Sequence, residues 1–212
     1  MTLHHEPLAV HLPELTLHGD LALPDAARAY LVFVSTCAGS GAAAFAAPLQ
    51  QAGFATLQID LLQSEECRFA DAGGHLPLLA KRLLAVIGQL HQQIGLDVIP
   101  ALPVGLVASG QATPAAVRVA AQRDQDIRAL VCHGGLIDLA GLQYLKVLQA
   151  PLLFVADPGD TPAVDNARRA QPHLPGICKV EVLPEADALA RAERLAALSI
   201  DWFHSHLIAK GR

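Results

Sequence analysis

The sequence contains few aromatic residues, few charged residues and no long apolar run. Aromatic residues make up only 4% of its 212 residues and charged residues only 17%, whereas hydrophobic residues make up 52%. A chain this apolar can bury enough surface to offset the entropy lost on ordering, which excludes a disordered protein. No apolar run approaches the roughly 18 residues that suggest a membrane span. With so few aromatics, the core must be built mainly from Ala, Leu, Val and Ile.

The sequence also lacks an excess of basic charge and a secretion signal. Its formal net charge is −5, which argues against nucleic-acid binding, because that binding depends on Lys and Arg at the phosphates. Met1–Glu6 has neither a basic nor an apolar signal region. No CxxC pair occurs among the four cysteines, Cys37, Cys67, Cys132 and Cys178. We therefore expect free thiols in a cytoplasmic protein that does not enter membranes.

Short apolar runs alternate with amphipathic stretches along most of the chain. The runs predict buried strands at Tyr30–Val34, Ala55–Ile59, Pro103–Val107, Ala129–Cys132, Leu152–Val155 and Val180–Leu183. The stretches predict helices at Ala42–Gln51, Leu76–Gln93, Pro114–Arg123 and Asp187–Leu207. Residues 8–23 predict an antiparallel strand pair containing a His18-Gly19-Asp20 turn. Together these patterns predict an α/β fold with a mostly parallel sheet, helices on both faces and an antiparallel lead-in.

The length favours a single domain over residues 1–212, with residues 1–7 and 208–212 as loose termini. In an open parallel sheet, ligands bind beyond the carboxyl ends of the strands. The candidate pocket residues are therefore those that follow predicted strands. They are Ser35, Thr36, Cys37, Ser109 and Gln111.

Four stretches resemble the dienelactone-hydrolase-like family of α/β hydrolases. Pro103–Val117, which contains Val-Gly-Leu-Val-Ala-Ser-Gly-Gln-Ala, resembles the family's strand, nucleophile elbow and helix. Ile127–Gly141 resembles the next strand and its Gly-Gly-x-x-Asp-Leu-Ala loop. Ala150–Val155 resembles the strand before the acid loop, and Asp201–Leu207 the terminal helix. The similarity runs from about Leu15 to Leu207 and implies an α/β-hydrolase fold.

The resemblance implies a Ser nucleophile on a tight elbow with small residues two positions before and after it. Alignment from Gly105 puts Gly110 at the nucleophile position, with small residues, Ala108 and Ala112, at these two places. Placing Ser109 there instead would put Val107 and Gln111 at the flanks, and both are too large for a tight elbow. Gly110 therefore occupies the apex, where Gly best tolerates the positive φ.

The other two triad positions implied by the resemblance are Asp160 and Ala188. Asp160 falls on the family's acid, although an Asp in a Pro/Gly turn is also ordinary turn chemistry. Ala188 falls where the family has its His, and no His lies between His173 and His204. The chain has ten histidines, yet this position has none.

The sequence therefore predicts a pseudoenzyme of the dienelactone-hydrolase type that binds a small ligand or another protein. The alternative is an active hydrolase of small esters or lactones, using Ser109, or Cys37 with His133, and Asp160. No cofactor is expected, and the histidine pairs near the chain ends have no neighbouring Cys to complete a metal site. Relatives are sometimes fused to phosphoribosyltransferase domains, so a domain of that kind is a candidate partner.

Overall fold

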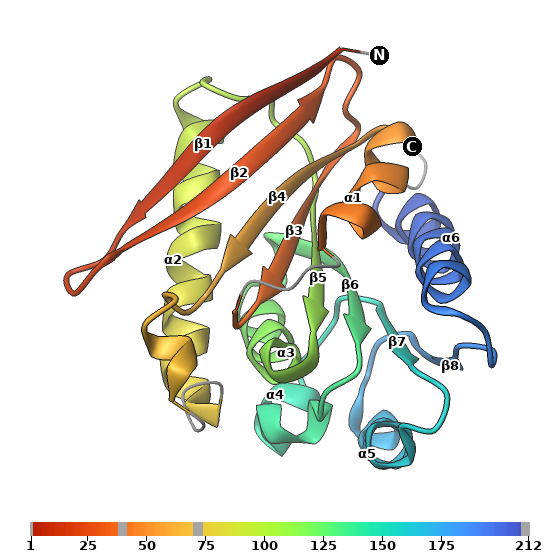
Figure 1. The fold of residues 1–212 in the computed structure, drawn as a ribbon. Coiled ribbons are helices and arrows are strands. Elements are labelled where there is room, and N and C mark those ends of the chain that lie inside the picture. Colours follow the sequence, from red (N-terminus) through yellow and green to blue (C-terminus); the bar gives the residue numbers. More distant parts are fainter. Residues whose placement is uncertain (1, 38–41, 70–73, 209–212) are drawn as a thin grey trace.

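The protein is built around a single eight-stranded sheet. The computed structural model describes residues 2–37, 42–69 and 74–208. The strands are β1 (Leu3–His11), β2 (Thr16–Pro24), β3 (Ala29–Ser35), β4 (Phe54–Asp60), β5 (Val104–Ser109), β6 (Ile127–His133), β7 (Leu152–Ala156) and β8 (Cys178–Val182). Their order across the sheet is β1-β2-β4-β3-β5-β6-β7-β8 (Figure 1). The pairs β1–β2 and β2–β4 are antiparallel and the others parallel, which confirms the predicted fold class.

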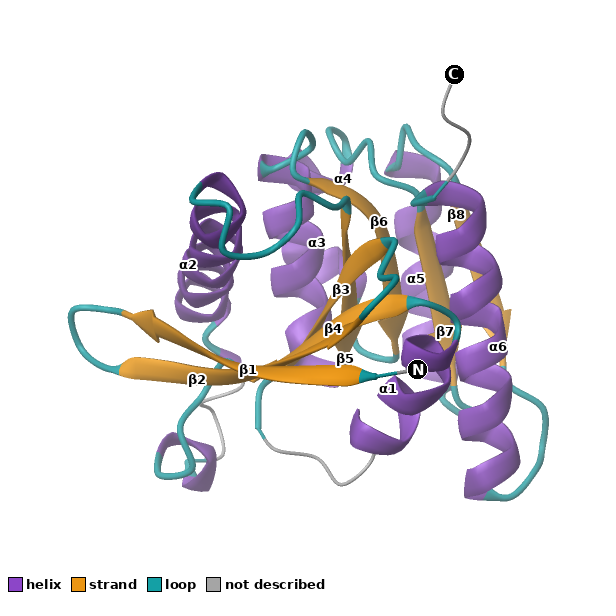
Figure 2. Cartoon of the chain, turned by 90° about the horizontal axis from the view of Figure 1, so that it is seen from above, coloured by secondary structure: helices purple, strands orange, loops and turns teal. Residues whose placement is uncertain are grey.

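Helices cover both faces of this sheet. They are α1 (Ala42–Gln51), α2 (Leu76–Gly95), α3 (Thr113–Gln122), α4 (Leu142–Leu145), α5 (Thr161–Ala170) and α6 (Ala188–His206). The described residues also contain the short 3-10 helices η1 (Glu66–Arg68), η3 (Gly110–Ala112), η4 (Ile137–Ala140) and η5 (Gln171–His173). Helices α2, α3 and α5 pack on one face, and α1 and α6 on the other (Figures 1 and 2). Each central strand is buried on both sides, because Tyr30 and Val32 face one core and Leu31 and Phe33 the other.

Helix α6 makes a close contact with the sheet at Gly105. A Cβ atom at Gly105 would lie 2.8 Å from Phe203 Cε1 and 3.1 Å from Leu207 Cδ2, so the absence of a side chain permits this approach. The Phe203 ring also meets Phe54 edge-on, with centroids 6.0 Å apart. The last helix therefore completes the core on the α1 side of the sheet.

The antiparallel lead-in turns earlier than the sequence predicted. The chain reverses between Leu12 and Leu15, where the Leu12 amide donates to the Leu15 carbonyl at 2.8 Å. Gly19 lies inside β2, opposite Leu8 of β1. A Cβ atom there would lie 2.9 Å from Leu57 Cδ1, so Gly19 permits a close approach of β4 and does not form a turn.

The amino-terminal segment is ordered by pairing, which corrects the expectation of a loose terminus. Residues 3–7 belong to β1, where Leu3 pairs with Pro24 and Pro7 with Asp20. Most of the other expected loose terminus, residues 209–212, lies outside the described residues. None of the described helices is sufficiently long and apolar to span a bilayer.

Candidate functional site

A cavity of about 570 Å³ lies where the carboxyl ends of the central strands meet α1 and α6. This volume is typical of sites that bind small molecules. Its wall is mainly apolar and includes Phe33, Phe45, Val107, Leu183 and Leu195. Its polar side chains include Ser35, Asp60, Ser109, His133, Asp157 and Arg191. The cavity therefore combines an apolar surface with a few hydrogen-bonding groups.

The structure brings some of the candidate residues together here and leaves others out. Ser35, Cys37, Ser109, His133 and Ala188 line the cavity. The other candidates, Thr36, Gln111, Gly110 and Asp160, are not among its lining residues. Sequence reasoning missed Asp60 and Asp157. Each directly follows or ends a strand, so strand-end position was the signal that could have identified them.

The elbow between β5 and α3 has Gly110 at its apex. Gly110 has a φ of 53°, in the left-handed region that favours glycine. The small flanking residues Ala108 and Ala112 are both buried, as a tight elbow requires. A Cβ atom at Gly110 would meet no described atom within 4 Å apart from its chain neighbours. The backbone thus makes a sharp turn at Gly110, with open space where a side chain would lie.

The loop after β6 packs directly against this elbow. A Cβ atom at Gly135 would collide with the Gly110 carbonyl oxygen, and Gly135 has a φ of 82°. The Thr113 hydroxyl donates to the Gly134 carbonyl at 2.9 Å. These contacts fix the elbow through backbone atoms, so its shape does not depend on a side chain at position 110.

Asp160 and Ala188, which the family resemblance places at the acid and base positions, do not form a base–acid pair. Asp160 caps α5, and its carboxylate accepts a hydrogen bond from the Ala163 amide at 3.2 Å. Ala188 is the first residue of α6, which is capped by Asp187. A methyl group cannot accept a proton. In this structure Asp160 therefore stabilises a helix start and has no His to orient.

A different acid lies beside His133. The Nε2 atom of His133 is 3.3 Å from Asp157 Oδ2, although without hydrogen-bond alignment. The Nε atom of Arg191 is 3.6 Å from the other oxygen of the same carboxylate. Ser109 is the cross-strand neighbour of His133. His133 thus lies next to Asp157 at the ends of neighbouring strands. The acid expected from the sequence for the alternative hydrolase site was instead Asp160.

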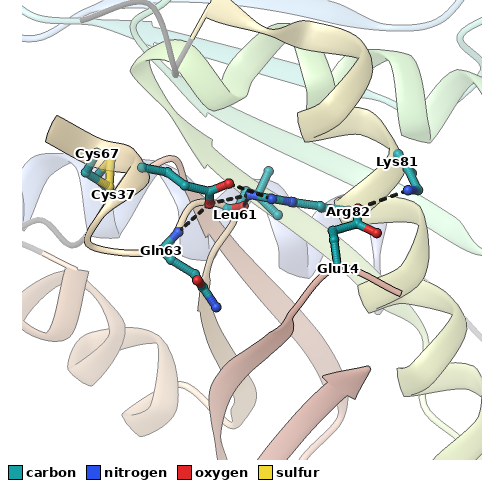
Figure 3. Close-up of polar contacts among 8 residues, drawn as sticks. Glu14, Cys37, Leu61, Gln63, Cys67, Lys81 and Arg82 are labelled. Carbon is teal, nitrogen blue, oxygen red and sulfur yellow. Dashed lines mark hydrogen bonds and ion pairs between the residues drawn. A yellow bond between two sulfur atoms is a disulfide. The ribbon is translucent and has the colours of Figure 1, made fainter. Parts of the chain in front are cut away.

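Cys37 and Cys67 form a disulfide, so the expectation of free thiols is wrong for this pair. Their Cα atoms are 6.0 Å apart across a sequence separation of 30. Because β3 and β4 are neighbours in the sheet, the segments that follow them meet at its carboxyl edge. The Cys37 sulfur is therefore bonded to Cys67 and is not a free nucleophile (Figure 3).

The remaining cysteines, Cys132 and Cys178, are free. Burial raises the pKa of the Cys132 thiol to about 12 and that of Cys178 to about 11. Both thiols are therefore protonated at neutral pH and are poor nucleophiles. Within residues 2–37, 42–69 and 74–208, no group of three or more His, Cys, Asp or Glu side chains is arranged to hold a metal ion.

A buried ion pair anchors the segment that carries the disulfide. The Arg82 side chain is only 2% exposed, and its two terminal nitrogens donate to the two Glu66 carboxylate oxygens at 2.7 and 2.8 Å. Arg82 also donates to the Leu61 carbonyl at 2.7 Å (Figure 3). These Arg82 hydrogen bonds hold the pKa of Glu66 below its ordinary value of 4.5. Arg82 therefore holds η1, and with it Cys67, against α2.

Comparisons with solved structures agree with this architecture. A dienelactone hydrolase from Anabaena variabilis ATCC 29413 superposes with a TM-score of 0.85 and 28% identity, over 97% of this chain and 99% of that one. Est1E from Butyrivibrio proteoclasticus superposes with a TM-score of 0.74 and 12% identity, over 96% of this chain and 99% of that one. No protein-family model matches the chain.

A sequence relative is longer than this chain. A Mycobacterium tuberculosis (strain H37Rv) protein named "Putative phosphoribosyl transferase" is 34% identical over 220 residues, which cover 99% of this chain and 48% of that protein. The chain thus spans about half the length of the curated relatives it matches. The strand order and the structural similarities show that the chain has the α/β-hydrolase fold and resembles dienelactone hydrolases.

Proposed function

We propose that the chain is a non-hydrolytic protein of the α/β-hydrolase fold that binds a small ligand in its cavity. The observation that carries this proposal is Gly110, which has the backbone of an elbow apex but no side chain to attack a substrate. Ala188 likewise offers no base at the position of the family's His. Triad members act as a unit, so the loss of nucleophile and base removes most of the acceleration. The cavity keeps the apolar walls and polar groups that binding requires.

A second candidate function, hydrolysis of a small ester or lactone, is favoured by the neighbours of His133. Ser109 lies beside His133 in the sheet, and Asp157 lies 3.3 Å from its ring. In this arrangement Ser109 would be the nucleophile, His133 the base and Asp157 the orienting acid. Among the hydrogen bonds of the described residues, however, none joins the Ser109 hydroxyl to His133. We therefore rank this candidate below ligand binding.

Installing both missing side chains is expected to create ester hydrolysis. The double variant Gly110→Ser/Ala188→His should hydrolyse p-nitrophenyl acetate about 100-fold faster than the unmodified chain, because a positioned base contributes roughly this factor or more. Open space surrounds position 110, although its positive φ strains a side chain placed there, and both its neighbour Ser109 and Ala188 line the cavity. The rate and site-specific labelling of position 110 by a fluorophosphonate probe measure this gain.

The matched control is Gly110→Ala/Ala188→His, which adds a Cβ atom and the imidazole but no hydroxyl. Its rate should remain at the level of the unmodified chain. The proposal fails if the unmodified chain itself hydrolyses the ester and its Ser109 is labelled by the probe. Loss of both signals in Ser109→Ala would then establish the second candidate function.

We also propose that a phosphoribosyltransferase-type domain is a protein partner of this chain. The support is the name and the greater length of the M. tuberculosis relative, about half of which this chain matches. Light scattering after size-exclusion chromatography, with and without such a domain supplied separately, would detect a complex. Elution of the two chains as independent species would count against this partner.

A further inference from the structure

We propose that the ligand of the cavity is a small organic amine, bound as its ammonium ion by Asp60 beside Phe33 and Phe45. This inference rests on the proposed ligand-binding function and names the chemical class of the ligand. It does not involve the elbow. It follows from the hydrogen bonding of Asp60, from the charges in the cavity and from the aromatic wall.

The Asp60 carboxylate has unused hydrogen-bonding capacity. Asp60 ends β4, lines the cavity and is the cross-strand partner of Ser35. It accepts a hydrogen bond from the Ser35 hydroxyl. An ionised carboxylate has about four acceptor positions, and no second side-chain donor reaches Asp60 among the residues that the structure describes. A ligand with N–H groups can therefore occupy the remaining acceptor positions.

The two carboxylates of the cavity differ in their charged surroundings. Asp157 lies 3.6 Å from the Arg191 guanidinium and 3.3 Å from the His133 ring. In contrast, no Lys, Arg or His nitrogen of the described chain lies within 4.0 Å of Asp60. His18 also lines the cavity but lies beyond that distance. Among the described residues, the negative charge of Asp60 thus has no neighbouring cation, which favours a cationic ligand beside it.

Two aromatic side chains line the same cavity as Asp60. Phe33 and Phe45 meet edge-to-face, with ring centroids 5.4 Å apart, and both line the cavity. Aromatic rings attract ammonium groups through their quadrupole and also bury apolar surface. The site therefore suits an ammonium group attached to an apolar body.

The geometry disfavours an anionic ligand. Besides its contact with Asp157, Arg191 donates to the Ala186 carbonyl at 2.8 Å, so its guanidinium is already engaged. A ligand carboxylate would also meet the unpaired charge of Asp60. The choice between ammonium and carboxylate ligands is therefore a direct test of the inference.

The test compares three probes of similar shape by isothermal titration calorimetry with the full chain. They are phenethylamine, phenethyl alcohol and hydrocinnamate. We expect phenethylamine to bind about tenfold more tightly than phenethyl alcohol, the size of a charge-assisted hydrogen bond, and hydrocinnamate to bind most weakly. In Asp60→Asn, which keeps an acceptor for Ser35, the tenfold preference should disappear. The matched control Asp201→Asn removes an exposed carboxylate that does not line the cavity and should keep the preference.

The outcomes separate this inference from the proposed function. Equal binding of amine and alcohol, a preference for hydrocinnamate, or no phenethylamine binding overturns the amine inference. In the first two cases ligand binding in the cavity still stands. The proposed function itself fails only if the unmodified chain hydrolyses esters through Ser109. If Asp60→Asn does not fold, the order of affinities of the three probes for the unmodified chain decides whether the amine inference holds.

Discussion

Loss of the Cys37–Cys67 disulfide is expected to lower the free energy of unfolding by about 3.5 kcal/mol. The bond closes a loop with a sequence separation of 30, and cross-linking a loop of this length restricts the unfolded chain by roughly that amount. The bond joins the cavity-lining Cys37 to Cys67 of η1, so its loss also removes a covalent restraint on the edge of the cavity. Urea unfolding of Cys37→Ser/Cys67→Ser against the oxidised chain measures the effect.

Reduction of the unmodified chain provides the control for the serine substitutions. The reduced chain should unfold at nearly the same urea concentration as the double-serine variant. Adding reductant to that variant should change nothing. Equal stability of the oxidised chain and the variant would show that the bond does not contribute to stability in solution.

Glu66→Ala is expected to destabilise the fold by about 3 kcal/mol, because it leaves the buried Arg82 charge without its carboxylate partner. Arg82 is 2% exposed and makes both of its strongest side-chain contacts with Glu66. Adding Arg82→Met to this variant should recover part of the loss, since it removes the unpaired charge and keeps much of the volume. Thermal and urea unfolding of the single and double variants test this expectation.

An exposed ion pair between α2 and the turn that joins β1 and β2 provides a matched control. Lys81 donates to Glu14 at 3.0 Å, but the two side chains are 57% and 38% exposed (Figure 3). Glu14→Ala should therefore destabilise the fold much less than Glu66→Ala does, because an exposed ion pair contributes little to stability. If Glu14→Ala and Glu66→Ala cost the same, burial of Arg82 would not be the cause.

The Glu66–Arg82 pair should also affect how stability depends on pH. Since the hydrogen bonds from Arg82 lower the folded-state pKa of Glu66 below 4.5, the unfolded chain binds this proton more tightly. The stabilisation is therefore complete above pH 4.5 and is lost as the pH falls through the lowered pKa. The difference between the unmodified chain and Glu66→Ala should shrink over that acidic range. A difference that stays constant there would contradict this explanation.

Burial explains why most elements could be predicted from the sequence. Most residues of β3 to β7 are apolar and buried, and α2 buries Leu79, Leu83 and Leu90 at helical spacing. Helix α5 was missed because much of it is polar, with Arg168 and Arg169 in its last turn. Its capping Asp160 followed by a Thr-Pro start was the available signal.

The location of the site could be predicted from the sequence, but the contacts between its side chains could not. Strand ends predicted Ser35, Ser109 and His133 at one edge of the sheet, and all three line the cavity. Which side chains meet depends on loop paths that residue patterns do not specify. This is why His133 lies beside Asp157 and why the link between Cys37 and Cys67 was not foreseen.

The contact of α6 with Gly105 also has a consequence for how the chain folds during synthesis. The core on the α1 side of the sheet requires Phe203, which lies near the end of the described chain. Strands emerging from the ribosome can pair earlier and α1 can cover part of this face, but the part that α6 covers, including Phe54, stays open to water until α6 has been made. A nascent chain that pauses before α6 would expose an apolar sheet surface, the kind of surface that chaperones protect from aggregation.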